Sequence, residues 1–401
     1  MKNYKWTVFF LVKALDGVIS SAMDMTFNLL DVELGEEIAI VLCVNIMKEN
    51  IPAFLKGDKN VPNPDGDGGT PTVAFFSITS TRDPLGKWNT EMKLIDENAD
   101  FDLTVADDLQ YYFRRVVLAG HQADRYILFT WDHGMSYGIF GAVAEDGTTK
   151  VLTMDQLSQA IHWGFDGKKI DLLIMMDCYM LMLDTAYALQ HAAKFLVAAE
   201  DDLNIAGYNY ISIFKRITAD PGISTKKLAK LAVNSYAKKL FMTKTQADSP
   251  LHKATLFACD LDKYHIFSVL LRQFFKEVSD NIVGWKTDVW IAAHGAFPLQ
   301  GGYHLFDFYT FIQKLDGKLN GRGNVLIELM TEVWDEIVIA QVIGDQVPKA
   351  PGFYPRGFSL FLPYHATGNV PSNSSYQPFL NTSFAKDMGV LPIILALATV
   401  Q

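Results

Sequence analysis

Short runs of β-branched and aromatic residues alternate with helix-length segments along much of this 401-residue chain. The alternation is typical of a mainly parallel sheet with helices on both faces, because a crossover between parallel strands needs a long connection. Apolar spacing predicts amphipathic crossover helices over 103–118 and 179–192. The predicted strands lie at 6–12, 38–46, 73–78, 126–131, 170–176, 195–199, 254–259 and 358–362. The sequence therefore predicts an α/β fold whose sheet lies between helices.

The second half of the chain has a more helical texture, which begins after about residue 209. We therefore divide the chain into a core over residues 1–215 and a C-terminal region over residues 216–401 that packs against it. The apolar tail at 390–400 contains Pro392 and is too short for a bilayer, which needs about 20 residues. We expect the tail to dock on the fold. Helices are predicted near 225–240, 264–278, 306–315 and 325–342.

Composition and charge limit the possible partners. Apolar residues make up 49% of the chain and charged residues 20%, which is typical of a globular protein. The net charge is −10 and no basic cluster is present, so nucleic acid is not an expected partner, and neither is a membrane.

The apolar run at 6–12 has no small-residue cleavage site after it and predicts a strand. Unless a leader has been removed, we expect a cytoplasmic protein.

The chain has three cysteines, Cys43, Cys178 and Cys259, and no two are close enough in sequence for a zinc or redox motif. Cys43 and Cys259 lie inside apolar runs, which predicts two core residues. The turn at 63–69 resembles a calcium loop, but Ala74 stands where an EF-hand needs glutamate. No motif in the sequence requires a cofactor. Because the cysteines are far apart in the sequence, any cysteine chemistry depends on a single thiol.

Candidate catalytic residues follow two of the predicted strands. Asp132, His133 and Gly134 follow the strand at 126–131, and Cys178 follows the strand at 170–176. Parallel strands open on one edge of the sheet, so His133 and Cys178 can converge on one substrate there. A helix predicted to begin near residue 179 would favour a negative sulfur at its N-terminus. The Gly134 N–H is a candidate oxyanion donor.

A serine nucleophile is a competing hypothesis. Residues 134–138 match the Gly-x-Ser-x-Gly elbow of serine hydrolases, with Ser136 at the centre. That elbow must lead into a helix, whereas residues 139–143 have strand character. We therefore rank Ser136 below Cys178 as the nucleophile.

These motifs resemble the clostripain family of cysteine peptidases, in the clan of caspases, gingipains and legumain. The likeness rests on Trp-Asp-His-Gly at 131–134 and Asp-Cys-Tyr-Met at 177–180. It extends to the strand at 5–8, the helix at 103–120, the segment 195–200 with Tyr208 and Tyr210, and the strand at 357–363. The order of these segments implies a caspase-like sheet.

The resemblance implies that Cys178 is the nucleophile, that His133 is the general acid and base, and that the N–H groups of Gly134 and Cys178 face the oxyanion. Family members are often activated by cleavage between the two catalytic residues. Here that interval contains Lys150, in a polar segment at 142–153 that we expect to be an exposed loop. The chemistry requires no cofactor, and calcium enters only through the resemblance, since calcium dependence also occurs in the family.

One departure concerns specificity. The family commonly reads Asp-Ala-Cys, with its acid selecting Arg or Lys in the substrate, whereas this chain has Met176 and Asp177 before Cys178. Side chains alternate along a strand, so Asp177 is expected to point away from the side that Met176 and Cys178 share. Three more acids, Glu200, Asp201 and Asp202, follow the next strand and are candidates to restore a charge.

We therefore predict a cysteine endopeptidase that acts on peptides or proteins through a thioester intermediate. A non-catalytic relative that binds a peptide or partner is the alternative, since Met176 departs from the family pattern. A serine hydrolase that uses Ser136 is third.

Overall fold

The computed structural model describes most of the chain. The described residues are 3–15, 19–56, 58, 69–134, 137–143, 149–203, 208–242, 254–299, 305–319, 321–347, 354–362 and 377–399.

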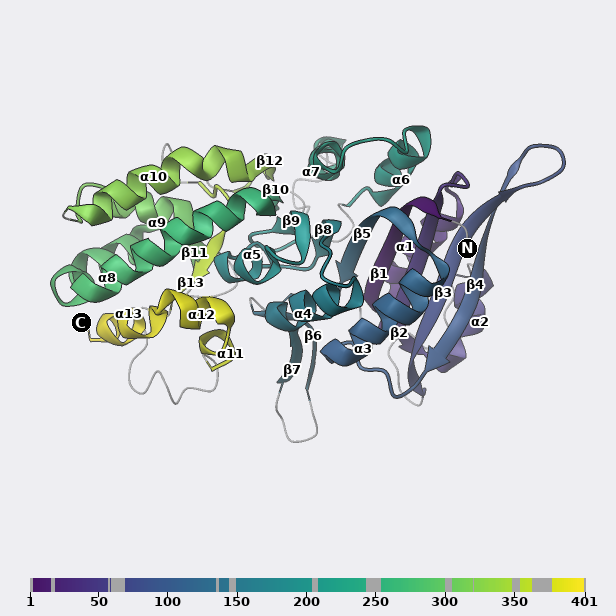
Figure 1. Cartoon of the computed structure of the whole chain (residues 1–401), viewed down its shortest axis with the longest axis horizontal. Helices are drawn as coiled ribbons and strands as arrows, with labels where there is room; N and C mark the ends of the chain where they lie inside the picture. Colours follow the sequence, from purple (N-terminus) through teal and green to yellow (C-terminus); the bar gives the residue numbers. More distant parts are fainter. Residues whose placement is uncertain are drawn as a thin grey trace.

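Nine strands of the described chain form one mixed sheet in the order β12-β10-β9-β8-β5-β1-β2-β3-β4 (Figure 1). The five central strands, β9 to β2 in this order, are parallel to one another, and antiparallel strands continue the sheet at both edges. The strands are β1 (Tyr4–Lys13), β2 (Ile38–Met47), β3 (Pro71–Arg82), β4 (Trp88–Asn98), β5 (Ala123–Trp131), β8 (Ile170–Met176), β9 (Ala193–Ala199), β10 (Thr255–Asp260) and β12 (Val338–Ile343). The α/β prediction is confirmed.

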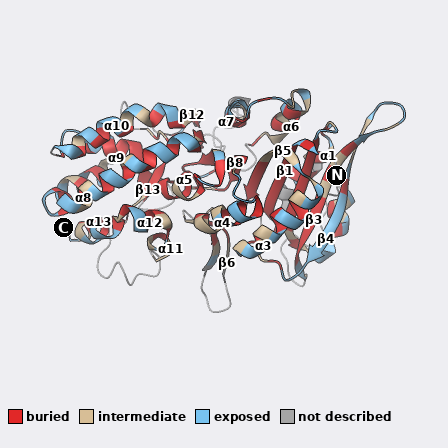
Figure 2. Ribbon diagram, viewed as in Figure 1, coloured by how far each residue is buried: buried red, intermediate tan, exposed pale blue. Residues whose placement is uncertain are grey.

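Helices cover both faces of the sheet, and alternate side chains of each central strand enter one of two cores. In β1, Phe9 and Leu11 face one core while Val8 and Phe10 face the other. Figure 2 shows the central strands as buried and the outer surfaces of the helices as exposed. The helices of the first half are α1 (Ile19–Leu30), α2 (Ile51–Lys56), α3 (Ala106–Tyr111), α4 (Met154–Gly164), α5 (Leu183–Leu189) and α6 (Tyr210–Ala219), with a short 3-10 turn at Lys48–Asn50 and a π-helical turn at Tyr112–Leu118.

The second half adds a helical layer beside the β9–β12 end of the sheet (Figure 1). Its helices are α7 (Thr225–Met242), α8 (Leu261–Gly295), α9 (Phe308–Leu315), α10 (Arg322–Ile337), α11 (Gln377–Leu380), α12 (Ser383–Met388) and α13 (Val390–Leu397), and β11 (Leu305–Asp307) pairs with β13 (Ser359–Phe361). The apolar tail forms α13, which buries Val390, Ile393, Ile394 and Leu397. The expected docking of the tail is therefore confirmed. The boundary between residues 1–215 and 216–401 stays a prediction.

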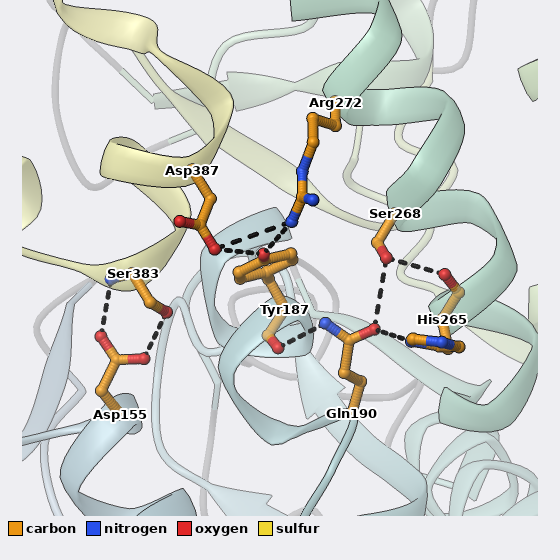
Figure 3. A network of polar contacts seen from close by, with 8 residues as sticks. All are labelled: Asp155, Tyr187, Gln190, His265, Ser268, Arg272, Ser383 and Asp387. Atoms are coloured by element: carbon orange, nitrogen blue, oxygen red, sulfur yellow. Dashed lines mark hydrogen bonds and ion pairs between the residues drawn. The ribbon is translucent and has the colours of Figure 1, made fainter.

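A polar network joins the helices on either side of that boundary (Figure 3). Asp155 of α4 accepts hydrogen bonds from the Ser383 N–H (2.8 Å) and hydroxyl at the start of α12. Tyr187 of α5 donates to Asp387 of α12 (2.5 Å) and accepts from Arg272 of α8 (2.8 Å). These contacts connect α12 with α4, α5 and α8.

Candidate active site

The two predicted catalytic residues follow neighbouring strands. β5 and β8 are parallel, and Trp131 is level with Met176 in their register. His133 and Cys178 therefore follow at the same edge of the sheet, each two residues after its strand ends. The His133 side chain is exposed, and Cys178 is half-buried against one of the two cores. The two strand ends are neighbours at one edge of the sheet, and the convergence of His133 and Cys178 on one substrate stays a prediction.

Gly134 lies against the backbone of Cys178. A Cβ atom added to Gly134 would lie 1.8 Å from the Cys178 carbonyl oxygen and 3.0 Å from the Cys178 nitrogen. No side chain other than hydrogen fits there, because real Cβ contacts with backbone atoms are much longer. The segment after His133 is thus in direct contact with the peptide of Cys178.

The Cys178 thiol is hydrogen-bonded to the segment that follows β9. Its Sγ accepts from the Leu203 N–H (3.3 Å) and donates to the Leu203 carbonyl (3.7 Å). Burial raises the pKa of the thiol, the Leu203 contact opposes this, and the nearby Asp202, Asp177 and Asp201 raise it further. The sulfur is therefore a neutral thiol near pH 7, and its use as a nucleophile requires a base.

The helix predicted after Cys178 begins later than expected. α5 starts at Leu183, and residues 179–182 instead run beside the end of β9, where the Leu181 N–H donates to the Ala199 carbonyl (2.7 Å). Tyr179 has φ +58°, a left-handed conformation that interrupts any helix at this point. The expected effect of a helix dipole on the sulfur is therefore wrong.

Met176 and Asp177 point to opposite faces of the sheet. Met176 is fully buried in the core that also contains Trp131. Asp177 is 1% exposed, and it accepts a hydrogen bond from the Thr130 hydroxyl of β5. Burial raises the pKa of Asp177 to about 8. As the alternation of side chains predicts, Asp177 does not share the side of Met176.

The three acids after β9 occupy different environments. Glu200 is fully buried beside Asp307, the residue before α9, and accepts from the Gly357 N–H (3.3 Å). Asp201 is buried, whereas Asp202 is exposed and accepts a hydrogen bond from the Tyr179 hydroxyl. Asp202 is therefore the one of these three that solvent reaches.

The segment predicted as an exposed loop contains a hairpin. β6 (Gly138–Val143) pairs antiparallel with β7 (Thr149–Thr153), and exposed Lys150 lies within β7 opposite Ala142. The prediction of a loop throughout 142–153 is wrong at these strands. The segment is polar, but its threonines and β-branched residues favour a strand, and β7 pairs with β6. The strand character assigned to residues 139–143 is confirmed.

Ser136, the alternative nucleophile, lies outside the described residues, as does the turn at 63–68.

Three residues around this edge were missed by sequence reasoning. Lys13 and Thr130 lie at the ends of β1 and β5 and contact Asp132 and Asp177, respectively, and Leu203 bonds to the thiol. For Lys13 and Thr130 the only sequence signal was a position at or next to a strand end, and Leu203 gave none, because pairing across the sheet depends on strand order. Within the described ranges, no group of three or more His, Cys, Asp or Glu side chains could hold a metal ion. None of the described helices is long and apolar enough to cross a bilayer.

The mixed α/β sheet, in which His133 and Cys178 follow neighbouring strands, is the arrangement that the resemblance to caspase-like cysteine peptidases implies. The profile of the clostripain family matches residues 75–388, so the chain belongs to that family and is a cysteine endopeptidase. No curated protein sequence matches the chain.

Solved structures of the same family share the fold. An inactive zymogen C11 protease from Parabacteroides distasonis is 13% identical, with a TM-score of 0.65 over 97% of this chain and 99% of that one. The secreted C11 cysteine protease of Bacteroides thetaiotaomicron named iotapain is 12% identical, with a TM-score of 0.66 over 97% and 100%. A structure of a secreted C11 protease from the same bacterium with an irreversible peptide inhibitor is 13% identical, with a TM-score of 0.63 over 96% and 99%. The predicted caspase-like, clostripain-type fold is therefore confirmed.

Proposed function

We propose that Cys178 is the nucleophile of this peptidase and that His133 is its general acid and base. The observation that supports the proposal is the contact of Gly134, the residue after His133, with the backbone of Cys178. His133 would take the thiol proton as sulfur attacks the substrate carbonyl carbon, and would then give that proton to the leaving amine. Water would hydrolyse the thioester with His133 acting as base. The N–H groups of Gly134 and Cys178 are the proposed oxyanion donors.

Substitution of the proposed residues tests this assignment. Cys178→Ala and His133→Ala are each expected to lower kcat/KM on a peptide substrate by at least about 10³-fold, because members of a nucleophile–base pair act as a unit. Ser136→Ala, the matched control, is expected to keep most of the activity. Loss of activity in Ser136→Ala but not in Cys178→Ala would instead support the serine hydrolase. A wild-type chain that binds peptides but cleaves none would support the non-catalytic alternative.

For specificity, we propose that uncharged side chains precede the cleaved bond. The acid that selects Arg or Lys in the family is replaced by Met176, which is buried among apolar residues. A cationic side chain placed there would lose water without gaining a charge partner. Asp177 faces the other side, and Glu200 and Asp201 are buried, which leaves Asp202 as the exposed acid near the thiol.

Fluorogenic peptides that differ only in Arg versus Leu or Ala before the cleaved bond measure this preference. We expect kcat/KM to be higher for the uncharged residue. A preference for Arg of tenfold or more, about 1.4 kcal/mol, would contradict the proposal. In that case Asp202→Asn is expected to reduce the Arg preference, because Asp202 is the acid within reach of solvent.

We also propose the hairpin of β6 and β7 as the processing segment, with Lys150 the site of cleavage if basic residues are accepted. Wild type and Cys178→Ala are then expected to differ on a denaturing gel, and Lys150→Gln to remain one chain. An intact wild-type chain with full activity would exclude a need for processing.

The remaining proposals concern partners and conditions. The substrate is a peptide or protein, the chemistry needs no cofactor, and neither nucleic acid nor a membrane is a proposed partner. Calcium dependence and a cytoplasmic location stay predictions. Activity measured with and without EGTA tests the first, and cell fractionation tests the second.

A further inference from the structure

Two buried carboxyl groups lie directly behind the proposed catalytic residues. Asp132 precedes His133 and is 3% exposed, and Asp177 precedes Cys178 and is 1% exposed. The pairing of Trp131 with Met176 places the two aspartates level at the ends of β5 and β8. Side-chain alternation directs both to the face opposite Met176, where Thr130 donates to Asp177.

A cation of the described chain, Lys13, lies beside this pair of carboxyl groups. Lys13 ends β1, which pairs with β5 on the side away from β8. Its Nζ lies 3.8 Å from Asp132 Oδ2 and donates to the Gly141 carbonyl of β6 at 2.6 Å, and both charged side chains are largely buried. A single lysine balances one carboxylate, so a second buried negative charge beside it would be uncompensated.

Asp177 is the member of the pair that is neutral near pH 7. Its Oδ1 is buried and makes no hydrogen bond of good geometry among the described residues, so an ionised oxygen there would be poorly solvated. Burial and the neighbouring charge of Asp132 raise the pKa of Asp177 to about 8, while hydrogen bonds from the Thr130 hydroxyl and the Asp132 backbone N–H oppose the rise.

We propose that Asp177 is a positioning residue that keeps the ends of β5 and β8, and hence Cys178 and the His133–Gly134 segment, in contact only while its carboxyl group is neutral. Ionisation would set two carboxylates against each other at the point where the two strands carry the proposed dyad. The repulsion would separate Gly134 from the Cys178 peptide and raise the pKa of the thiol. This inference rests on the proposed roles of Cys178 and His133.

The other titratable groups around Asp177 do not reproduce this behaviour. Asp132 and Lys13 form an ion pair, and Asp201 and Asp202 face the sulfur. Tyr208, whose hydroxyl donates to the Met175 carbonyl (3.1 Å), has a pKa raised by burial above its ordinary value of about 10. The pKa of Cys178 is also raised. Tyr208 and Cys178 therefore stay neutral as the pH passes 8.

The test compares Asp177→Asn with wild type across pH 6–9. Asparagine has the same shape, accepts the Thr130 hydrogen bond and carries no charge at any pH. The ratio of variant to wild-type kcat/KM is expected to rise about tenfold from pH 7 to pH 9, as a group with a pKa near 8 ionises only in wild type. Thr130→Val removes the donor that favours ionisation, so it is expected to move the alkaline loss of activity to higher pH and serves if Asp177→Asn does not fold.

A matched control separates positioning from stability. Asp184 of α5 is another buried acid, with a pKa raised by burial to about 7. Asp184→Asn is expected to alter stability, but its kcat/KM relative to wild type is expected to stay constant from pH 7 to pH 9. A ratio for Asp177→Asn that stays constant within about twofold would overturn the proposal.

The rate of Cys178 alkylation by iodoacetamide gives a readout independent of hydrolysis. In the Asp177→Asn variant, the Cys178 thiol is expected to become reactive at a lower pH than in wild type, because the carboxylate of Asp177 disfavours a thiolate. Equal alkylation profiles would again contradict the inference. Hydrolysis that survives Cys178→Ala would instead contradict the proposed dyad.

Discussion

At the scale of single residues, the site depends on close backbone contacts more than on the identity of its side chains. Gly134 is required because the Cys178 peptide occupies the space of a Cβ atom. The sequence predicted Gly134 only as a donor of its N–H. The contact itself could not be predicted, since it depends on how two strand ends 44 residues apart approach each other.

Gly134→Ala is therefore expected to lower kcat/KM by about 10²-fold, because the His133 segment must move away from Cys178 and small displacements of reacting groups have effects of this size. Gly120→Ala is the matched control, since nothing lies within 4 Å of an added Cβ there. The kinetics of both variants and their melting temperatures check the prediction. Normal activity in Gly134→Ala would show that the segment tolerates the shift.

At the scale of elements, apolar strands were predictable and strands set by pairing were not. β8 is buried at every position, and its limits match the predicted 170–176. β4 was missed because it lies at the sheet edge, where charged residues alternate and most side chains are exposed. Residues 338–342, predicted as the end of a helix, form β12 because β10 offers them an antiparallel partner. Tertiary context thus overrode local periodicity at both edges.

The long helix α8 provides a prediction of its own. Gly284 lies in its interior with nothing within 4 Å of an added Cβ, so Gly284→Ala is expected to raise the free energy of unfolding by about 0.5–1 kcal/mol. Gly389 has equally open surroundings but φ +64°, so Gly389→Ala is expected to lower stability by a similar amount. Urea denaturation of the two variants measures the difference. Equal effects would show that backbone conformation does not control these positions.

At the scale of the whole molecule, four buried acids link stability to pH. Burial raises the pKa of Asp177 to about 8, of Asp184 to about 7 and of Asp307 to about 6, and it also raises that of Glu200. Between pH 4 and 8 the unfolded chain releases protons that the folded chain keeps, so folding becomes less favourable as pH rises.

The melting temperature is therefore expected to be higher at pH 5.5 than at pH 8. Asp184→Asn removes one of these proton differences, so its melting temperature is expected to change less over that interval. Calorimetry at several pH values measures both slopes. A wild-type melting temperature that rises toward pH 8 would show that these carboxyl groups ionise within the folded protein.

The order of the strands also determines when the site can be completed during synthesis. β9, whose following segment bonds to the Cys178 sulfur, pairs with β8 on one side and with β10, which lies more than 50 residues further along the chain, on the other. Until β10 leaves the ribosome, the nascent protein has both proposed catalytic residues but an unpaired apolar sheet edge beside them. Such an edge is open to pairing with other chains. We therefore expect the second half of this protein to protect the first from aggregation, and a nascent chain that stalls before β10 to need a chaperone.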